Sequence, residues 1–156
     1  MPAVFARENR VLLDILGRFE KALTRSSIDS MIEIVRTFEV RLSQHLRGQE
    51  ALLPVLSKHL STRGEPVARR RIEGGEHEER LRELRSDLQA GRWGKFVYKG
   101  QLFVTFLREY LRGADETLLP LARRLLTPEE WDHVRALHDS MRSAFAQEVA
   151  PQASKV

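Results

Sequence analysis

Residues 28–56, IDSMIEIVRTFEVRLSQHLRGQEALLPVL, decide the fold of this chain. Inward positions recur every third or fourth residue along the stretch, and the period-two alternation of a strand is absent. The inward series is Ile28, Met31, Val35, Phe38, Leu42, His45, Gln49, Leu52 and Leu56. This spacing predicts a long helix that packs one face along a helical bundle.

Three further segments have the same spacing. The first series is Phe5, Asn9, Leu12, Leu16, Phe19 and Leu23. The third is Val67, Arg70, Gly74, His77, Leu81, Leu84 and Leu88, and the fourth is Phe103, Leu107, Tyr110, Ala114, Leu118, Leu121 and Leu125. Together they predict an all-α fold, an antiparallel up-down-up-down four-helix bundle with a short C-terminal fifth helix. We expect the bundle over residues 1–150 and a frayed tail over residues 151–156.

Three breaks separate the four segments, at Ser26-Ser27, residues 62–66 and residues 91–94. Serine at the first break is a suitable N-cap for the helix that follows. Pro54 and Pro120 fall inside otherwise helical patterns, and each removes a backbone donor. We therefore expect a kink or a helix end at both prolines.

The segment Thr127-Pro128-Glu129-Glu130 has the residues of a helix start. Thr127 suits the N-cap, Pro128 the first helical position, and Glu130 follows the threonine by three residues, as in a capping box. These residues predict a fifth helix from about Pro128 to Gln147. Of the histidines outside the inward series, we expect His133 and His138 on this helix to have surface roles.

Composition excludes several classes of site. The chain has 156 residues, of which 42% are apolar, and no cysteine, so disulfides and thiolate metal sites are absent. We find no signal peptide and no stretch of ~20 apolar residues, so we expect a cytoplasmic protein that does not bind a membrane. The net charge is +4. The run Arg69-Arg70-Arg71 is followed by many glutamates, so we expect intrahelical pairing and no nucleic-acid binding.

An internal repeat relates the second and fourth segments. Residues 45–54, HLRGQEALLP, resemble residues 110–120, YLRGADETLLP. Both copies read aromatic-Leu-Arg-Gly and then Glu-x-Leu-Leu-Pro, with one extra residue in the second copy. The bundle is therefore expected to consist of two related helical hairpins.

Each inward series is interrupted by residues that an apolar core would not select. They are Asn9 on the first, His45 and Gln49 on the second, His77 with Glu73 one turn before it on the third, and Tyr110 with Ala114 one turn after it on the fourth. Four-helix bundles build metal sites from inward residues at one level on facing helices. Taken singly, each residue is better explained by packing or a hydrogen bond within the core. Together, however, these residues form a polar layer across all four helices, and burying such a layer unpaired is costly, so the layer predicts a site.

This arrangement resembles the hemerythrin family, including its HHE cation-binding domains, over nearly the whole chain. In that family, histidines and bridging glutamates on the four helices hold two irons that bind or react with oxygen. His45 and His77 match two of the family's histidines, whereas Asn9, Gln49, Tyr110 and Ala114 occupy the positions of other ligands. Residues 116–131 are similar to the closing segment of the family. An alternative alignment anchored on Pro54 would place Gln44 and Gly48 at the ligand positions of the second helix.

The resemblance implies a hemerythrin-like binding or sensor protein with a depleted pocket. The pocket is lined by Asn9, Gln49 and Ala114, and His45, His77, Glu73 and Tyr110 hold at most a single ion, a haem or a small ligand. The expected cofactor is iron in this reduced site, or none. A metal-free structural or protein-interaction bundle is the first alternative, and a di-iron oxygen-binding protein is the second. Nothing marks a nucleophile, so we expect binding rather than catalysis, and a protein partner or homo-oligomer is left open.

Overall fold

The computed structural model describes residues 3–25, 28–60 and 65–153, and within these ranges it contains helices and turns but no β-strand. The elements are α1 (Ala3–Arg25), α2 (Ile28–His59), α3 (Glu65–Gln89), α4 (Trp93–Gly113), the π-helical turn η1 (Ala114–Leu118), α5 (Leu119–Leu125) and α6 (Pro128–Ala153). The all-α prediction is confirmed. None of the described helices is long and apolar enough to cross a membrane.

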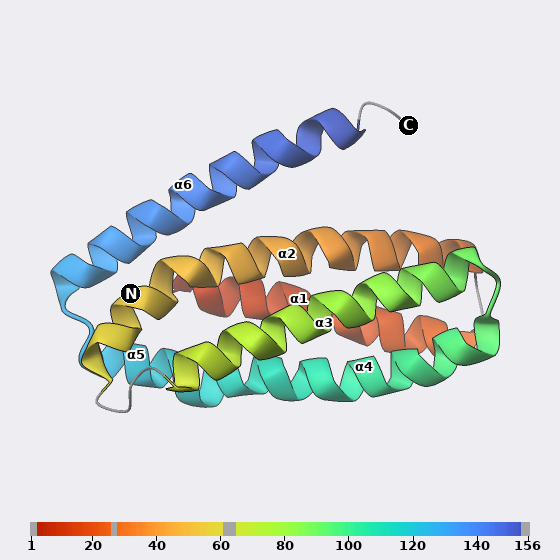
Figure 1. Ribbon diagram of the computed structural model, residues 1–156, viewed down its shortest axis with the longest axis horizontal. Helices are drawn as coiled ribbons and strands as arrows, with labels where there is room; N and C mark the ends of the chain where they lie inside the picture. The colour runs from red at the N-terminus through yellow and green to blue at the C-terminus, as the bar shows by residue number, and fades with distance from the viewer. Residues whose placement is uncertain (1–2, 26–27, 61–64, 154–156) are drawn as a thin grey trace.

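The first four helices form an antiparallel bundle (Figure 1). Each packs against its neighbour in the chain, and α4 returns to pack against α1, which closes the ring. The fourth helical segment continues beyond α4 through η1 and α5. The last helix, α6, folds back along the outside of α2. The bundle therefore carries an additional helix on one face.

The predicted inward faces are confirmed almost completely. All the inward residues of the first and third series are buried, and so are those of the second series except Ile28, which is 55% exposed. The centre of the bundle is aromatic. Phe19 makes edge-to-face contacts with Phe38, Phe96 and Phe103, at centroid separations of 6.0–6.2 Å. Such contacts add to the free energy gained from burying the rings.

The fourth inward face changes register at η1. Tyr110 and Ala114 are buried as predicted, but Leu118, Leu121 and Leu125 are only partly buried, and their neighbours Leu119, Ala122 and Leu126 are buried instead. A π-helical turn contains one residue more than an α-helical turn, so it rotates the following face by one position. The extra residue in the second copy of the repeat is accommodated in this way.

The prolines interrupt the helices less than expected. The helix α2 continues through Pro54 to His59, so it does not end at the proline. Pro120 lies near the start of α5, directly after η1, and the helix continues through it to Leu125.

The predicted capping box is confirmed. The Thr127 amide donates to Glu130 Oε2 at 2.9 Å, and the Glu130 amide donates to Thr127 Oγ1 at 3.2 Å. The helix that follows ends at Ala153 rather than at the predicted Gln147. The break at residues 91–94 is confirmed by the end of α3 at Gln89 and the start of α4 at Trp93.

Two predictions fall on residues that the structure does not describe. The N-cap at Ser26-Ser27 lies outside the described residues, and so does most of the break at residues 62–66. The division of the chain at residue 150 stays a prediction.

Candidate functional site

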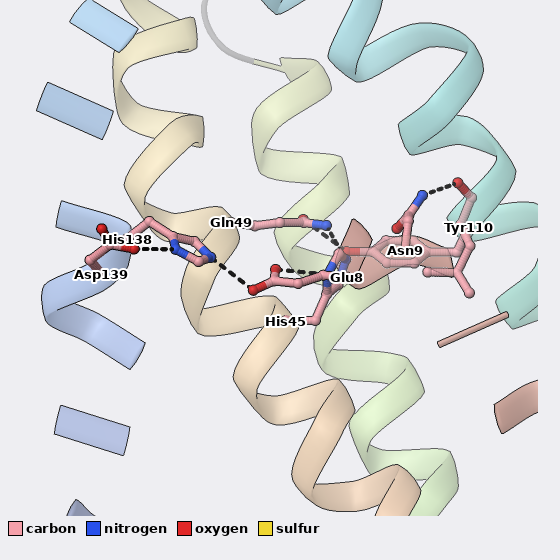
Figure 2. Close-up of polar contacts among 8 residues, drawn as sticks. Glu8, Asn9, His45, Gln49, Tyr110, His138 and Asp139 are labelled. Carbon is pink, nitrogen blue, oxygen red and sulfur yellow. Dashed lines mark hydrogen bonds and ion pairs between the residues drawn. The ribbon is translucent and has the colours of Figure 1, made fainter. Parts of the chain in front are cut away.

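Three of the predicted site residues form a hydrogen-bonded chain inside the bundle (Figure 2). The Tyr110 hydroxyl donates to Gln49 Oε1 at 3.2 Å, and Gln49 Nε2 lies 2.7 Å from His45 Nε2. The amide nitrogen can only donate, so Nε2 of His45 accepts, and its neutral ring carries the proton on Nδ1. All three side chains are buried. The polar groups on α2 and α4 therefore satisfy one another directly.

The chain of contacts continues from His45 to α6. His45 Nδ1 lies 3.6 Å from Glu8 Oε2, and Glu8 Oε1 lies 2.9 Å from His138 Nε2. His138 Nδ1 is in turn 3.6 Å from the exposed carboxylate of Asp139. Figure 2 shows these contacts running from Asp139 and His138 through Glu8 to His45. Polar contacts thus connect the core of the bundle with its outermost helix.

The surface role predicted for His138 was wrong, because its side chain is only 1% exposed. Trp131, Val134, His138 and Phe145 are all buried. The spacing of the first three along α6 was a sequence signal for an inward face that included the histidine. Sequence reasoning also missed Glu8, whose role depends on where α6 packs. His133, by contrast, is exposed.

Glu8 and His138 favour each other's charged forms. Burial opposes ionisation of Glu8, but its hydrogen bond with His138 and the proximity of His45 outweigh this and lower the pKa of Glu8 to about 2. The hydrogen bond with Glu8 raises the pKa of His138, against the opposing effect of burial. The pair therefore joins a carboxylate and an imidazolium over a wide pH range.

His77 lies on the other side of the layer, next to Tyr110. The two rings meet edge to face, with centroids 4.9 Å apart. His77 Nδ1 is 3.2 Å from Arg80 Nη1, and because a guanidinium only donates, this ring nitrogen accepts. Burial first, and then the charges of Arg80 and Arg70, lower the pKa of His77 to about 4. His77 is therefore neutral at pH 7.

A buried cation borders the layer. Arg70 is 8% exposed, its guanidinium carbon lies 3.5 Å from the centroid of the Tyr110 ring, and its Nη1 donates to the Tyr110 carbonyl at 2.7 Å. Arg71 pairs with Glu50 of α2 through contacts of 2.9 and 3.0 Å. The intrahelical pairing predicted for the arginine run was therefore wrong for these two residues, because each reaches a neighbouring helix.

The remaining predicted site residues lie apart from the hydrogen-bonded chain. Asn9 is buried and donates to the Leu111 carbonyl at 2.9 Å, and Ala114 is buried in η1. Glu73 is partly buried and lines a groove together with His77 and Tyr110.

The structure also favours the alignment of the second helix through His45. His45 is buried in the polar layer, whereas Gln44 is only partly buried and makes no hydrogen bond with another described side chain. Gly48, the other residue of the alternative alignment, lies against His138. The inward position of this turn therefore belongs to His45.

Replacing His77 by phenylalanine is expected to reduce the loss of free energy of unfolding that occurs when the pH is lowered. The pKa of His77 is lowered from 6.5 to about 4 on folding, so between these values the unfolded chain binds a proton that the folded chain does not. The free energy of unfolding of the parent should therefore fall, relative to the variant, by on the order of 1–2 kcal/mol between pH 7 and 4.5, after allowing for solvent screening. Urea unfolding at several pH values measures this difference.

Phenylalanine keeps an aromatic ring against Tyr110 and Phe103, so the packing contacts of His77 are retained. His133→Gln, at an exposed histidine, is the control and should run parallel to the parent. Parallel profiles for the parent and His77→Phe would contradict the lowered pKa.

The residues present do not fit a di-iron centre. At the positions where the family has bridging carboxylates, this chain has Gln49 and Ala114, which carry no charge. Hard anionic oxygens are the donors that two adjacent irons require. Among the described residues there is no group of three or more His, Asp or Glu side chains placed to hold a metal ion. The guanidinium of Arg70 also adds a positive charge beside the layer.

Comparison with known proteins gives one match. A family model described as the hemerythrin HHE cation binding domain matches residues 1–122. No curated protein and no solved structure matches the chain. The family match includes α1 to α4, η1 and the start of α5, whereas α6 lies beyond it. Because the match spans more than half of the 156 residues, the chain belongs to the hemerythrin HHE cation-binding domain family.

Proposed function

We propose that this chain is a hemerythrin-fold binding protein that works without a di-iron centre. In this proposal the polar layer is a structural element that holds the bundle and α6 together. The observation that carries the proposal is the direct contact between Gln49 and His45, because it occupies Nε2 of His45 with a hydrogen bond. An imidazole nitrogen that accepts a hydrogen bond from an amide has no free lone pair for a metal.

Electrostatics supports the same proposal. In a di-iron site, carboxylates compensate the charge of the metal ions. Here the Arg70 guanidinium, packed on the Tyr110 ring, already brings a positive charge to the layer, and burial of this guanidinium lowers the pKa of Arg70. A metal ion close to this guanidinium would be repelled.

The first test is the metal content of the protein purified without chelators and then exposed to iron(II) under anaerobic conditions. We expect about a tenth of an equivalent of iron or less, because neutral Gln49 and Ala114 supply no anionic bridge. Elemental analysis and visible absorption measure the outcome. Iron near two equivalents would overturn the proposal.

A rebuilt variant is the positive control for this assay. It carries the substitutions Asn9→His, Gln49→Glu, Tyr110→His, Ala114→Glu and Glu73→His, which restore the ligand set that the family resemblance implies. We expect it to bind about two iron ions and to gain thermal stability with them. A second version with Arg70→Met should bind iron more tightly, because the opposing charge is removed.

The reduced site predicted from the sequence is the second candidate function. Three of the four residues predicted to hold the ion, Glu73, His77 and Tyr110, line one groove of about 360 Å³ between α3 and α4, which favours this candidate, whereas the fourth, His45, does not line it. His77 is neutral there, and neutral imidazole is the form that binds metals. This candidate predicts about one metal ion per chain, lost in His77→Ala. The same elemental analysis distinguishes it from the metal-free proposal.

A further inference from the structure

A partly enclosed cavity of about 80 Å³ lies where α1, α2 and α6 meet. Arg7 of α1, Arg41 of α2 and Arg142 of α6 all line it. In the part of the chain that the structure describes, none of these three side chains forms an ion pair or a hydrogen bond with another residue. Three guanidinium groups from three helices are therefore available to a ligand in this cavity.

The charge of the cavity is positive. Glu8 is its one acidic lining residue among those described, and its two oxygens already lie 2.9 Å from His138 and 3.6 Å from His45. Asp139 of α6 is exposed, does not line the cavity, and lies 3.6 Å from the opposite nitrogen of His138. The three guanidiniums thus exceed the acidic charge, and guanidinium forks bind carboxylates through paired hydrogen bonds.

The rest of the wall favours an organic anion over an inorganic one. Val4, Val11 and Leu12 supply an apolar part of the lining. A water molecule takes up about 30 Å³ in the liquid, so a cavity of this size holds on the order of three water-sized groups. An anion with a short hydrocarbon body fits this volume and this wall.

Two buried polar atoms on the cavity wall have no hydrogen-bond partner among the described residues. They are His45 Nδ1 and Glu8 Oε2, and they lie 3.6 Å apart. The first can donate a hydrogen bond, because it carries the proton of the neutral ring, and the second can accept one. A ligand hydroxyl placed beside the pair can accept from the imidazole and donate to the carboxylate. Buried polar groups normally find such partners.

We propose that this cavity binds a small hydroxycarboxylate. The three arginines hold the carboxylate, Val4 and Leu12 contact the hydrocarbon part, and the hydroxyl lies between His45 and Glu8. The site depends on α6, which supplies Arg142 and lies outside the family match. The inference is separate from the metal-free proposal, because the cavity is formed by the packing of α6 and not by the absence of iron.

Isothermal titration of the full chain with three sodium salts at equal ionic strength tests this inference. Lactate is the simplest hydroxycarboxylate, propionate lacks only the hydroxyl, and chloride lacks both features. We expect saturable lactate binding, propionate binding weaker by about tenfold or more, and no saturable chloride binding, because loss of the hydroxyl leaves two buried groups unpaired. Equal affinity for lactate and propionate, or no saturable lactate binding, would overturn the proposal.

Two variants show whether binding occurs at this cavity. Arg41→Met and Arg142→Met should each weaken lactate binding by about tenfold or more, because each removes a charged hydrogen-bond donor. Arg36→Met is the matched control and should bind like the parent, because Arg36 is exposed, lies on the same helix as Arg41 and pairs with no other residue that the structure describes. All three positions are exposed, so the fold should be unchanged by circular dichroism. If Arg41→Met and Arg36→Met bound lactate with the same affinity, the ligand would lie elsewhere and the proposed site would be refuted.

Discussion

Replacing His138 by leucine is expected to lower the free energy of unfolding by about 2–4 kcal/mol. The substitution removes one partner of a buried ion pair and leaves the Glu8 carboxylate, only 17% exposed, with His45 as its single nearby imidazole. The Glu8 carboxylate is partly solvated, so we expect a loss of free energy of unfolding at the lower end of the range that is typical when a buried ion pair loses one partner. Urea unfolding followed by circular dichroism measures the change.

Two comparisons separate the ion pair from a general effect of the substitution. His133→Leu changes an exposed histidine on the same helix and should shift the free energy of unfolding by about 0.5 kcal/mol or less. Adding Glu8→Gln to His138→Leu should restore part of the loss, because the unpaired charge is removed. If His138→Leu and His133→Leu were equally stable, the contact between α6 and the bundle would not depend on this pair.

The pKa values of Glu8 and His138 predict the pH range in which their ion pair raises the free energy of unfolding. The pKa of Glu8 is lowered from 4.5 to about 2, so the stabilisation is present above pH 4.5 and is lost as the pH falls through 2. The pKa of His138 is raised from 6.5, so its stabilisation is present below pH 6.5 and is lost as the pH rises through the folded value. The advantage of the parent over the double variant should therefore be largest between about pH 4.5 and 6.5.

Replacing Gly48 by alanine is expected to destabilise the protein, although the substitution normally stabilises a helix. A Cβ at Gly48 would lie 2.9 Å from two atoms of the His138 ring. That ring is held by Glu8 on one side and by an edge contact with Phe5 at a centroid separation of 5.1 Å. Crowding of this kind costs about 1–3 kcal/mol, and over most of this range the cost exceeds the about 0.5–1 kcal/mol gained in helix propensity. Thermal and urea unfolding measure the net change.

Gly17 is the matched control for Gly48. A Cβ there would meet no described atom within 4 Å other than those of its chain neighbours and of the nearby backbone of its own helix, so Gly17→Ala should stabilise α1 by about 0.5–1 kcal/mol. The two glycine substitutions are thus expected to have opposite signs. In a His138→Ala background the obstructing ring is absent, and Gly48→Ala should no longer destabilise. If the penalty at Gly48 persisted there, its cause would lie outside the contact with α6.

Local sequence patterns were sufficient for most of the fold. A helix buries every third or fourth residue, so the spacing of apolar residues located the inward faces of α1, α2 and α3. The capping box at Thr127 and Glu130 is formed by residues three positions apart, so it could be read directly. The one-residue insertion in the repeat was also visible. Only the structure decided that it forms a π-helical turn inside a continuous helix rather than a loop.

The candidate site depended more strongly on tertiary structure. The sequence by itself determined that polar residues interrupt all four inward faces, because burial follows helical periodicity. It did not determine that Glu8 meets His138, since these residues are 130 positions apart and no local rule specifies where α6 packs. Likewise, Arg70 could pair within its own helix or stack on Tyr110, and only the packing of α3 on α4 selected the second. Side-chain contacts between helices depend on relative position and rotation, which the assembled bundle sets.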